Sequence, residues 1–417
     1  MKKVLFISTS FYPDPFVGSV RVKEFSKWLP DYGWKPYVLS KNYGFKVTKE
    51  DFEKNVSPEV SVIYLNSAPT QSSTGAEPRF REKIKALASR FLGRFILSPD
   101  PSVIFWRSVI SGIFKIVKDV EPDLVITTGP PQSIHLVGIE IKRMFPDVAW
   151  ISDFRDVYRV GGSYRTGVLG AFKHWRSLRW EIKTYMESDG IVCAIPEHIR
   201  WIRRLTPSAS HKAKLITNGA PAEFFDKSIR VGTRCSSEYY KVSVVGFSQC
   251  IESLYLSEAI AKVNGGVMRI DLFFVGIEPS NKRQIVRALP NNSFFLGPVS
   301  HDKAVAEIMG SDILVALLSK ERSRQFNLTS KLFEYCATGR PVLVVNPTRP
   351  DRRLFGKLPG VWMVNEASSE KIHSTIKEIL DTKGRDYQER VSYFERNFSR
   401  REQTRVLGEF MDEVIGL

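Results

Sequence analysis

The stretch that decides the fold is Asn327-Leu-Thr-Ser-Lys-Leu-Phe-Glu-Tyr-Cys-Ala-Thr-Gly-Arg-Pro-Val-Leu-Val-Val345. Its residue types predict a loop, a short helix, a tight turn at Gly339 and a strand from Val342 to Val345. Thr329 or Ser330 is the expected N-cap of the helix. A short β-branched run of this kind is typical of a strand buried on both faces, so the stretch predicts an α/β fold with parallel strands.

The same helix carries charges that its own local structure does not explain. Ser330, Lys331 and Glu334 lie on one side of its first turns. A helix start with a lysine suits a phosphate, and a carboxylate one turn later suits the two hydroxyls of a ribose. An ordinary surface ion pair between Lys331 and Glu334 is the alternative, and the residues alone leave both interpretations open.

Residues 329–343, T-S-K-L-F-E-Y-C-A-T-G-R-P-V-L, resemble the nucleotide-sugar signature of GT-B glycosyltransferases, in particular family 4. In that family the first position is usually proline, where this chain has Thr329. Phe326 stands where the family often carries an earlier glutamate that touches the donor sugar. The resemblance implies donor contacts at Leu328, Thr329, Ser330, Lys331 and Glu334.

The chain begins with a predicted β-loop-α-β unit. Val4 to Ser8 form a buried strand, and Gly18-Ser19 open a helix after an aromatic loop. The G-x-G-x-x-G pattern of dinucleotide-binding folds is missing from this unit, which counts against a dehydrogenase. The unit resembles the first one of the same family, which implies that Gly18 and Ser19 lie against the donor's phosphates. A simple helix cap at Ser19 is the alternative.

A later predicted strand, Ala149 to Tyr158, carries Asp153, Arg155 and Asp156 at its C-terminal end. This segment resembles the family pattern x-A-D-F-R-D-P-W. We expect Asp153 to be the catalytic residue that contacts the transferred sugar or the acceptor, and Asp156 to be structural. An N-cap combined with an ion pair to Arg155 is the alternative, because such clusters are often structural.

The second half of the chain repeats the pattern from Lys241 onward. By the same resemblance, Gly246 would abut the donor's diphosphate, while Pro298 and Val299 would line the nucleobase pocket. An ordinary connection between strand and helix is the alternative for the latter pair. Residues 249–253 contain no cation, although the family has a basic pair there. Lys320, Arg322 and Arg324 are candidates to replace it.

Composition sets wider limits. The 417 residues include 25% charged and 43% hydrophobic ones, as in ordinary folded proteins, and their number suits two domains. No apolar run approaches the roughly 18 residues of a spanning helix. The four cysteines have no paired spacing, so we expect free thiols in a reducing cytoplasm. The net charge of +16 indicates an anionic partner, but no zinc-finger or RNA-binding signature favours nucleic acid.

Residues 79–97 form the most distinctive helical pattern of the chain. Large apolar residues recur every three or four positions, and six Lys or Arg accompany a single acid, Glu82. A basic amphipathic helix of this kind is typical of an interfacial membrane helix that binds an anionic membrane surface. An apolar stripe packed on the domain core is the commoner alternative.

Together these patterns predict two doubly wound, Rossmann-like α/β domains facing a cleft, as in the GT-B fold. The expected domains are residues 1–220 on the acceptor side, residues 221–390 for the nucleotide sugar, and a terminal helix, 391–417, that crosses back to the first domain.

The resemblance implies a retaining glycosyltransferase that moves a sugar from a nucleotide-diphosphate donor to a lipid-linked glycan of a surface polysaccharide. With no D-x-D motif, it implies no metal and no other cofactor. We expect the protein in the cytoplasm, peripheral on the inner face of the membrane. Three alternatives remain: a degenerate homologue that binds a nucleotide sugar or a partner, a nucleic-acid-binding protein, and a sugar 2-epimerase.

Overall fold

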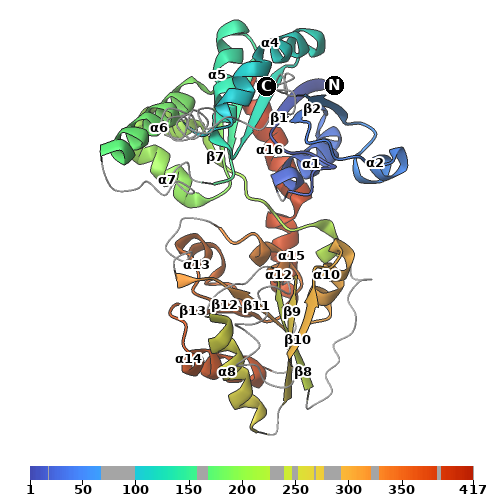
Figure 1. Ribbon diagram of the computed structural model, residues 1–417, viewed down its shortest axis with the longest axis vertical. Helices are drawn as coiled ribbons and strands as arrows, with labels where there is room; N and C mark the ends of the chain where they lie inside the picture. Colours follow the sequence, from blue (N-terminus) through green and yellow to red (C-terminus); the bar gives the residue numbers. More distant parts are fainter. Residues whose placement is uncertain are drawn as a thin grey trace, which may run out of the picture. The chain divides into compact units, whose positions relative to one another are not determined.

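The computed structural model describes residues 1–16, 18–66, 99–156, 168–225, 239–246, 252–266, 269–276, 293–320, 328–382 and 387–416. The chain forms two compact units, drawn in Figure 1. Unit 1 consists of Met1–Thr217 together with Gln403–Leu417, and unit 2 of Asn218–Glu402.

The sheet of unit 1 is parallel and doubly wound. Its described strands follow the order β3-β2-β1-β4-β5-β6-β7, so the chain winds outward from β1 first in one direction and then in the other. The strands are β1 (Lys2–Ser8), β2 (Trp34–Lys41), β3 (Ser61–Leu65), β4 (Leu124–Gly129), β5 (Ala149–Phe154), β6 (Gly190–Cys193) and β7 (Ala213–Leu215).

Helices cover both faces of this sheet because alternate residues of each strand face opposite sides. Along β1, Val4 and Phe6 belong to one apolar cluster, whereas Leu5 and Ile7 belong to another. The first cluster packs on α1 and α16, and the second on α4 and α5. The described helices are α1 (Gly18–Trp28), α2 (Lys49–Asn55), α4 (Val103–Val120), α5 (His135–Met144), α6 (Val168–Glu187), α7 (Pro196–Leu205) and α16 (Arg400–Val414).

Unit 2 repeats this plan. Its described strands follow the order β10-β9-β8-β11-β12-β13, again parallel and winding outward from the first strand in both directions. The strands are β8 (Tyr239–Val245), β9 (Arg269–Val275), β10 (Ser293–Gly297), β11 (Ile313–Leu317), β12 (Val342–Val345) and β13 (Val361–Val364). The predicted strand from Val342 to Val345 is therefore confirmed, and it is buried on both faces.

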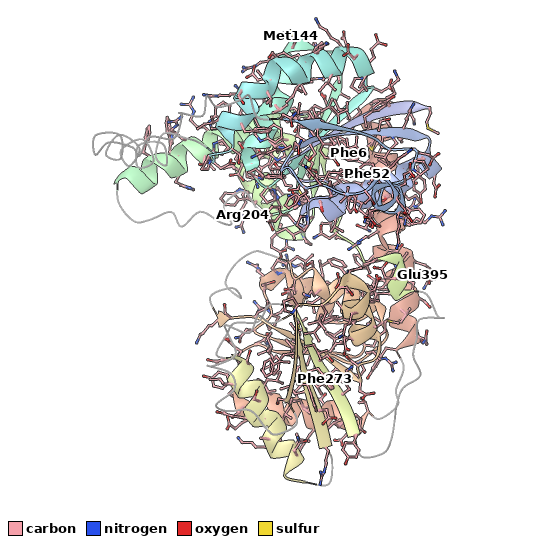
Figure 2. The ribbon with its side chains drawn as sticks, turned by 45° about the vertical axis from the view of Figure 1, so that its right-hand side comes forward. Phe6, Phe52, Met144, Arg204, Phe273 and Glu395 are labelled. Atoms are coloured by element: carbon pink, nitrogen blue, oxygen red, sulfur yellow. The ribbon has the colours of Figure 1, made fainter. Side chains whose placement is uncertain are left out.

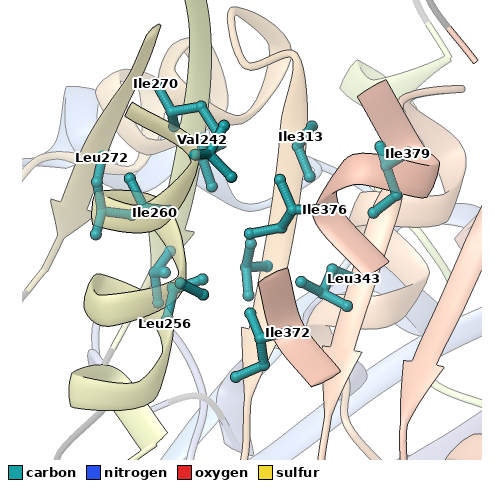
Figure 3. Close-up of a cluster of buried hydrophobic side chains, with 14 of the residues drawn as sticks. Val242, Leu256, Ile260, Ile270, Leu272, Ile313, Leu343, Ile372, Ile376 and Ile379 are labelled. Atoms are coloured by element: carbon teal, nitrogen blue, oxygen red, sulfur yellow. The ribbon is translucent and has the colours of Figure 1, made fainter. Parts of the chain in front are cut away.

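One face of the unit 2 sheet packs on α8 and α14. Figure 3 shows Leu256 and Ile260 of α8, and Ile376 of α14, gathered against Val242 and Ile313 of the strands. The other face packs on α10, α12, α13 and α15. The described helices are α8 (Glu252–Asn264), α10 (His301–Met309), α12 (Lys331–Ala337), α13 (Arg349–Phe355), α14 (Ser369–Asp381) and α15 (Gln388–Phe398).

Unit 2 extends to Glu402, beyond the expected domain boundary at residue 390. Helix α15 belongs to unit 2 because Phe394 packs on Phe333 and Phe355 there, and because buried Arg390 donates to the carbonyls of Cys336 and Pro359. The chain rejoins unit 1 only at Gln403, and α16 then packs into the core of that unit.

Several features singled out from the sequence lie outside the described residues, namely residues 79–97, Arg322, Arg324, Phe326, Cys235 and Cys250. Among the cysteines that are described, Cys193 and Cys336 are free and buried. No helix in the described ranges is long and apolar enough to cross a membrane.

Candidate functional site

The C-terminal ends of β8 and β11 meet at the point where the strand order of unit 2 reverses. In open α/β sheets this topological switch point is the usual place for a ligand. A pocket of about 140 Å³ lies there. It is lined by Val244, Val245, Gly246, Val315, Ala316, Leu317, Leu318, Leu328, Thr329, Ser330, Lys331, Tyr335 and Thr348.

Gly246 ends β8 at the edge of this pocket. Its φ of +89° lies in the left-handed region that favours glycine, and its N–H donates to the carbonyl of Val275 at 2.7 Å. A Cβ at this position would collide with the Nζ of Lys331. The missing side chain therefore lets the lysine amine lie directly over the end of the strand.

Thr329 and Ser330 lead into α12 without capping it. Ser330 has helical backbone angles and makes no side-chain cap bond, so the predicted N-cap is wrong for that residue. Thr329 instead donates its N–H (2.9 Å) and its hydroxyl (2.8 Å) to the carboxylate of Asp351. Asp351 is fully buried and closes the capping box of α13 with Thr348. This anchorage holds the lining loop against α13.

Lys331 and Glu334 are both half-buried on α12. Within the described part of the chain, neither side chain has a hydrogen bond or an ion pair, so the alternative of a surface ion pair between them is wrong. Burial lowers the pKa of Lys331, opposed by the charge of Glu334. Burial also raises the pKa of Glu334, opposed by Lys331, Arg400 and His301. Burial therefore disfavours the charged form of both side chains.

A contact between a histidine and a glutamate lies close enough to act electrostatically on Glu334. The Nε2 of His301, the first residue of α10, is 3.1 Å from the Oε1 of Glu223 in the short 3₁₀ helix Ala222–Phe224. This hydrogen bond raises the pKa of His301. Glu223 and Arg400 also act electrostatically on Glu334, so Glu334 lies among several charges; it is not one of the residues that line the pocket.

The other residues predicted for the donor are placed differently. Pro298 is exposed and Val299 is half-buried in the loop after β10, and neither lines the pocket. Their role at a nucleobase stays a prediction. Lys320 is no free replacement for the missing basic pair, because its amine lies 3.9 Å from Glu366.

Asp153 in unit 1 is only 2% exposed. Both of its carboxylate oxygens accept from Arg21, at 2.9 and 3.0 Å, and Thr128 also donates to it. Arg21 in turn donates to the carbonyls of Ile216 and Thr217. In this structure Asp153 therefore orients Arg21, which fastens the end of the first unit. Its expected contact with sugar or acceptor stays a prediction.

Gly18 and Ser19 have partners within unit 1. A Cβ at Gly18 would come within 2.6 Å of Nη1 of Arg155, whose guanidinium donates to the carbonyls of Gly18, Gly129 and Pro130. The Arg155 guanidinium thus lies directly against Gly18, and the predicted contact of Gly18 and Ser19 with the donor's phosphates stays a prediction. The Ser19 hydroxyl donates back to Phe16 and Asp14 carbonyls, so it is not a helix cap.

Sequence reasoning missed Arg21 and Asp351 altogether. Each is the partner of a residue that it did single out, Asp153 and Thr329 respectively, but the partner lies 132 or 22 positions away. No local spacing points to either contact. The described residues hold no cluster of His, Cys, Asp or Glu that could bind a metal ion.

No protein-family model matches the chain, and no curated protein sequence does either. Solved structures do match over the full length. Sucrose-phosphate synthase from Thermosynechococcus elongatus superposes with a TM-score of 0.67 at 15% identity, covering 99% of each chain. The chain has the GT-B fold.

HepE from Anabaena, solved in complex with UDP, gives a TM-score of 0.67 at 12% identity, covering 99% of this chain and all of the other. UDP-GlcNAc 2-epimerase from Neisseria meningitidis, bound to UDP-GlcNAc, gives 0.56 at 12% identity, covering 99% of this chain and all of the other. Identities this low show the GT-B fold and leave the chemistry to be argued from the site.

Proposed function

We propose that this chain is a glycosyltransferase that binds a nucleoside diphosphate sugar in unit 2 and transfers the sugar to a glycan acceptor. The observation that carries the proposal is the pocket at the switch point, where the amine of Lys331 lies against Gly246 at the end of β8 and has no ion-pair partner among the described residues. A diphosphate would supply a counter-charge for this half-buried amine.

Lys331 and Glu334 would bind different parts of the donor. Lys331 would stabilise the charge that grows on the diphosphate as the sugar leaves, an effect that is strongest in a site shielded from water. Glu334, one turn further along α12, would accept hydrogen bonds from the two ribose hydroxyls. Two proteins of the same fold are bound to UDP or UDP-GlcNAc, which supports a nucleoside diphosphate as the ligand.

The finer parts of the proposal rest on the sequence. The resemblance of residues 329–343 supports a family-4 enzyme of the hexosyltransferase type that retains anomeric configuration. The net charge of +16 supports an anionic partner, and we assign the acceptor to a lipid-linked glycan of a surface polysaccharide. The enzyme would then act in the cytoplasm, peripherally on the inner face of the membrane.

One observation favours a second candidate, a degenerate homologue that binds a nucleotide sugar or a partner protein without catalysis. Glu252 lies within residues 249–253, where the family has its basic pair, and is only 3% exposed. Its Oε1 accepts from the N–H of Lys320 and the amide of Asn346. The segment where the family has its basic pair thus carries a buried carboxylate, Glu252, rather than a cation.

The test is thermal stabilisation of the full chain by UDP, GDP and ADP, with CMP as a control. A ligand at about 100 times its dissociation constant contributes roughly 2.7 kcal/mol to the stability of the protein that binds it. We expect one diphosphate to raise the melting temperature of the wild type, and Glu334→Gln to lose most of the shift. Glu389→Gln, an exposed change in the same unit, is the matched control.

A ligand-side experiment separates the ribose contact from the diphosphate contact. The 2′-deoxy form of the active diphosphate should bind the wild type more weakly, but it should bind Glu334→Gln no more weakly than the ribose form does. Hydrolysis or transfer of the corresponding nucleotide sugar then distinguishes the enzyme from the degenerate homologue. Absence of any diphosphate shift would overturn the proposal itself.

A further inference from the structure

Among its described side chains, helix α6 buries Glu181, Thr184 and Tyr185 in unit 1 and exposes Phe172 and Trp175. The inward side combines apolar packing by Trp180 with a polar network. Tyr185 donates to Glu181 at 2.7 Å and lies 2.6 Å from the Nε2 of His198, while Trp201 donates to the same glutamate at 2.8 Å. This network fixes the rotation of the helix, so its outward side has a definite composition.

The outward side carries aromatic rings where solvent-facing helices usually carry polar residues. Phe172 is 52% and Trp175 is 50% exposed, and the two rings stack with their centroids 5.9 Å apart. Figure 2 shows α6, the pale green helix at the edge of its unit, extending away from the sheet. Two stacked, half-exposed rings on one helix face form an apolar surface that nothing described in the unit covers.

Arginines accompany the two rings. The guanidinium of Arg176 lies 5.9 Å from the centroid of Phe172, and that of Arg179 lies 4.9 Å from the centroid of Trp175. These four residues follow a spacing of i, i+3, i+4 and i+7, which places them on one stripe of the helix. From Ala171 to Trp180 the sequence contains no Asp or Glu, so all charged side chains of this segment are cationic.

We propose that this stripe, Phe172, Trp175, Arg176 and Arg179, docks on the anionic surface of a lipid bilayer. Aromatic rings with neighbouring cations suit the interface, where the rings enter the headgroup layer and the guanidinium groups meet lipid phosphates. The charge complementarity selects an anionic membrane over a neutral one. These four residues are other than residues 79–97, whose membrane role is predicted from the sequence alone and which lie outside the described residues.

The arrangement favours a bilayer over single-stranded nucleic acid. A nucleic-acid platform needs ring faces that are open for base stacking. Here the two rings stack on each other, and each also has an arginine packed against it. Ring edges and guanidinium groups remain available, and these suit lipid headgroups.

The first experiment is sedimentation of the full chain with phosphatidylcholine vesicles that contain about 30% phosphatidylglycerol. Arg176→Gln/Arg179→Gln should bind about thirtyfold more weakly at low salt, because each surface cation contributes roughly a fivefold factor. Phe172→Ser/Trp175→Ser should weaken the binding that persists at high salt. The matched controls in unit 2 are Lys303→Gln/Lys357→Gln and Phe294→Ser, an exposed ring that is also stacked.

The second experiment tests insertion directly. Lipids brominated on their acyl chains should quench part of the tryptophan fluorescence of the wild type, and Trp175→Phe should lose that quenched part while keeping vesicle binding. Both α6 double variants binding like the wild type would overturn the proposal, as would equal binding to vesicles without phosphatidylglycerol. Loss of DNA binding rather than vesicle binding in the arginine variant would assign the stripe to nucleic acid instead.

Discussion

The two units share one strand plan but use their switch points in opposite ways. In unit 1, between β1 and β4, Arg155 spans the carbonyls of Gly18, Gly129 and Pro130, and Asp153 is locked to Arg21. In unit 2 the equivalent place, between β8 and β11, is a pocket of about 140 Å³ lined by Lys331, whose amine has no partner in the part of the chain that the structure describes.

The difference shows how to distinguish a charge that builds the fold from one that serves a ligand. A buried charge with all of its partners present contributes to architecture, and removing one partner is expensive. A half-buried charge without a partner lowers the stability of the free protein, and a ligand of opposite charge can offset that cost. The following predictions test this contrast.

Asp153→Asn should have the largest effect. The side chain keeps its shape but leaves the guanidinium of Arg21 buried without its counter-charge, which typically costs about 3–5 kcal/mol. We expect a large fall in the melting temperature, measured by circular dichroism. A double-mutant cycle with Arg21→Met should show strong coupling, because both changes act on the same contact.

The outcome also tests the catalytic role predicted for Asp153. If Asp153 only positions Arg21, the variant should lose thermal stability, and any loss of turnover rate should follow from that loss of stability. If Asp153→Asn instead melted like the wild type and lost only the turnover rate, Asp153 would be a substrate-contacting group, as the sequence predicted.

Lys331→Met should have the opposite signature. The long apolar side chain fills the same space without a charge. Because burial lowers the pKa of Lys331 in the folded chain, its charged form costs stability at any pH below that lowered pKa, and the variant should melt higher near neutral pH. It should bind the active diphosphate about tenfold to a hundredfold more weakly, the value of a charge-assisted hydrogen bond.

Calorimetric titration measures this loss of affinity, with Lys303→Met on the exposed side of α10 as the control. A variant that bound the diphosphate as tightly as the wild type would remove Lys331 from the site. The switch point of unit 2 would then have no charge that serves a ligand, and it would no longer differ from that of unit 1 in this respect.

The contrast also explains how far the sequence could predict the molecule. Alternating and β-branched runs such as Val342–Val345 predicted buried parallel strands, because burial on both faces requires that composition. The family resemblance placed Lys331 and Gly246 at one donor site; the two residues are neighbours in the structure, and their role at a donor stays a prediction. Local patterns could not show that Asp153 is paired with Arg21, because a contact across 132 positions leaves no trace in the local spacing.

Glu334→Gln should have a smaller, pH-dependent effect. Burial raises the pKa of Glu334, so ionising it costs stability, and that cost is absent below the ordinary glutamate pKa and complete above the raised one. The variant should therefore melt higher than the wild type near neutral pH and equally at acid pH. A stabilising ion pair at Glu334 would give the opposite result: the wild type would melt higher than the variant near neutral pH and would lose that advantage as the pH fell.

Thr329→Val should have the smallest effect, about 1 kcal/mol, because it removes one hydrogen bond to buried Asp351 and keeps the shape. Thr329→Pro, the residue usual in the resembling family, also removes the N–H donor to that carboxylate and should cost more. Chemical denaturation measures both losses. Equal stability of the proline variant and the wild type would mean that Asp351 does not hold the loop, and that the anchorage of the pocket lies elsewhere in α12.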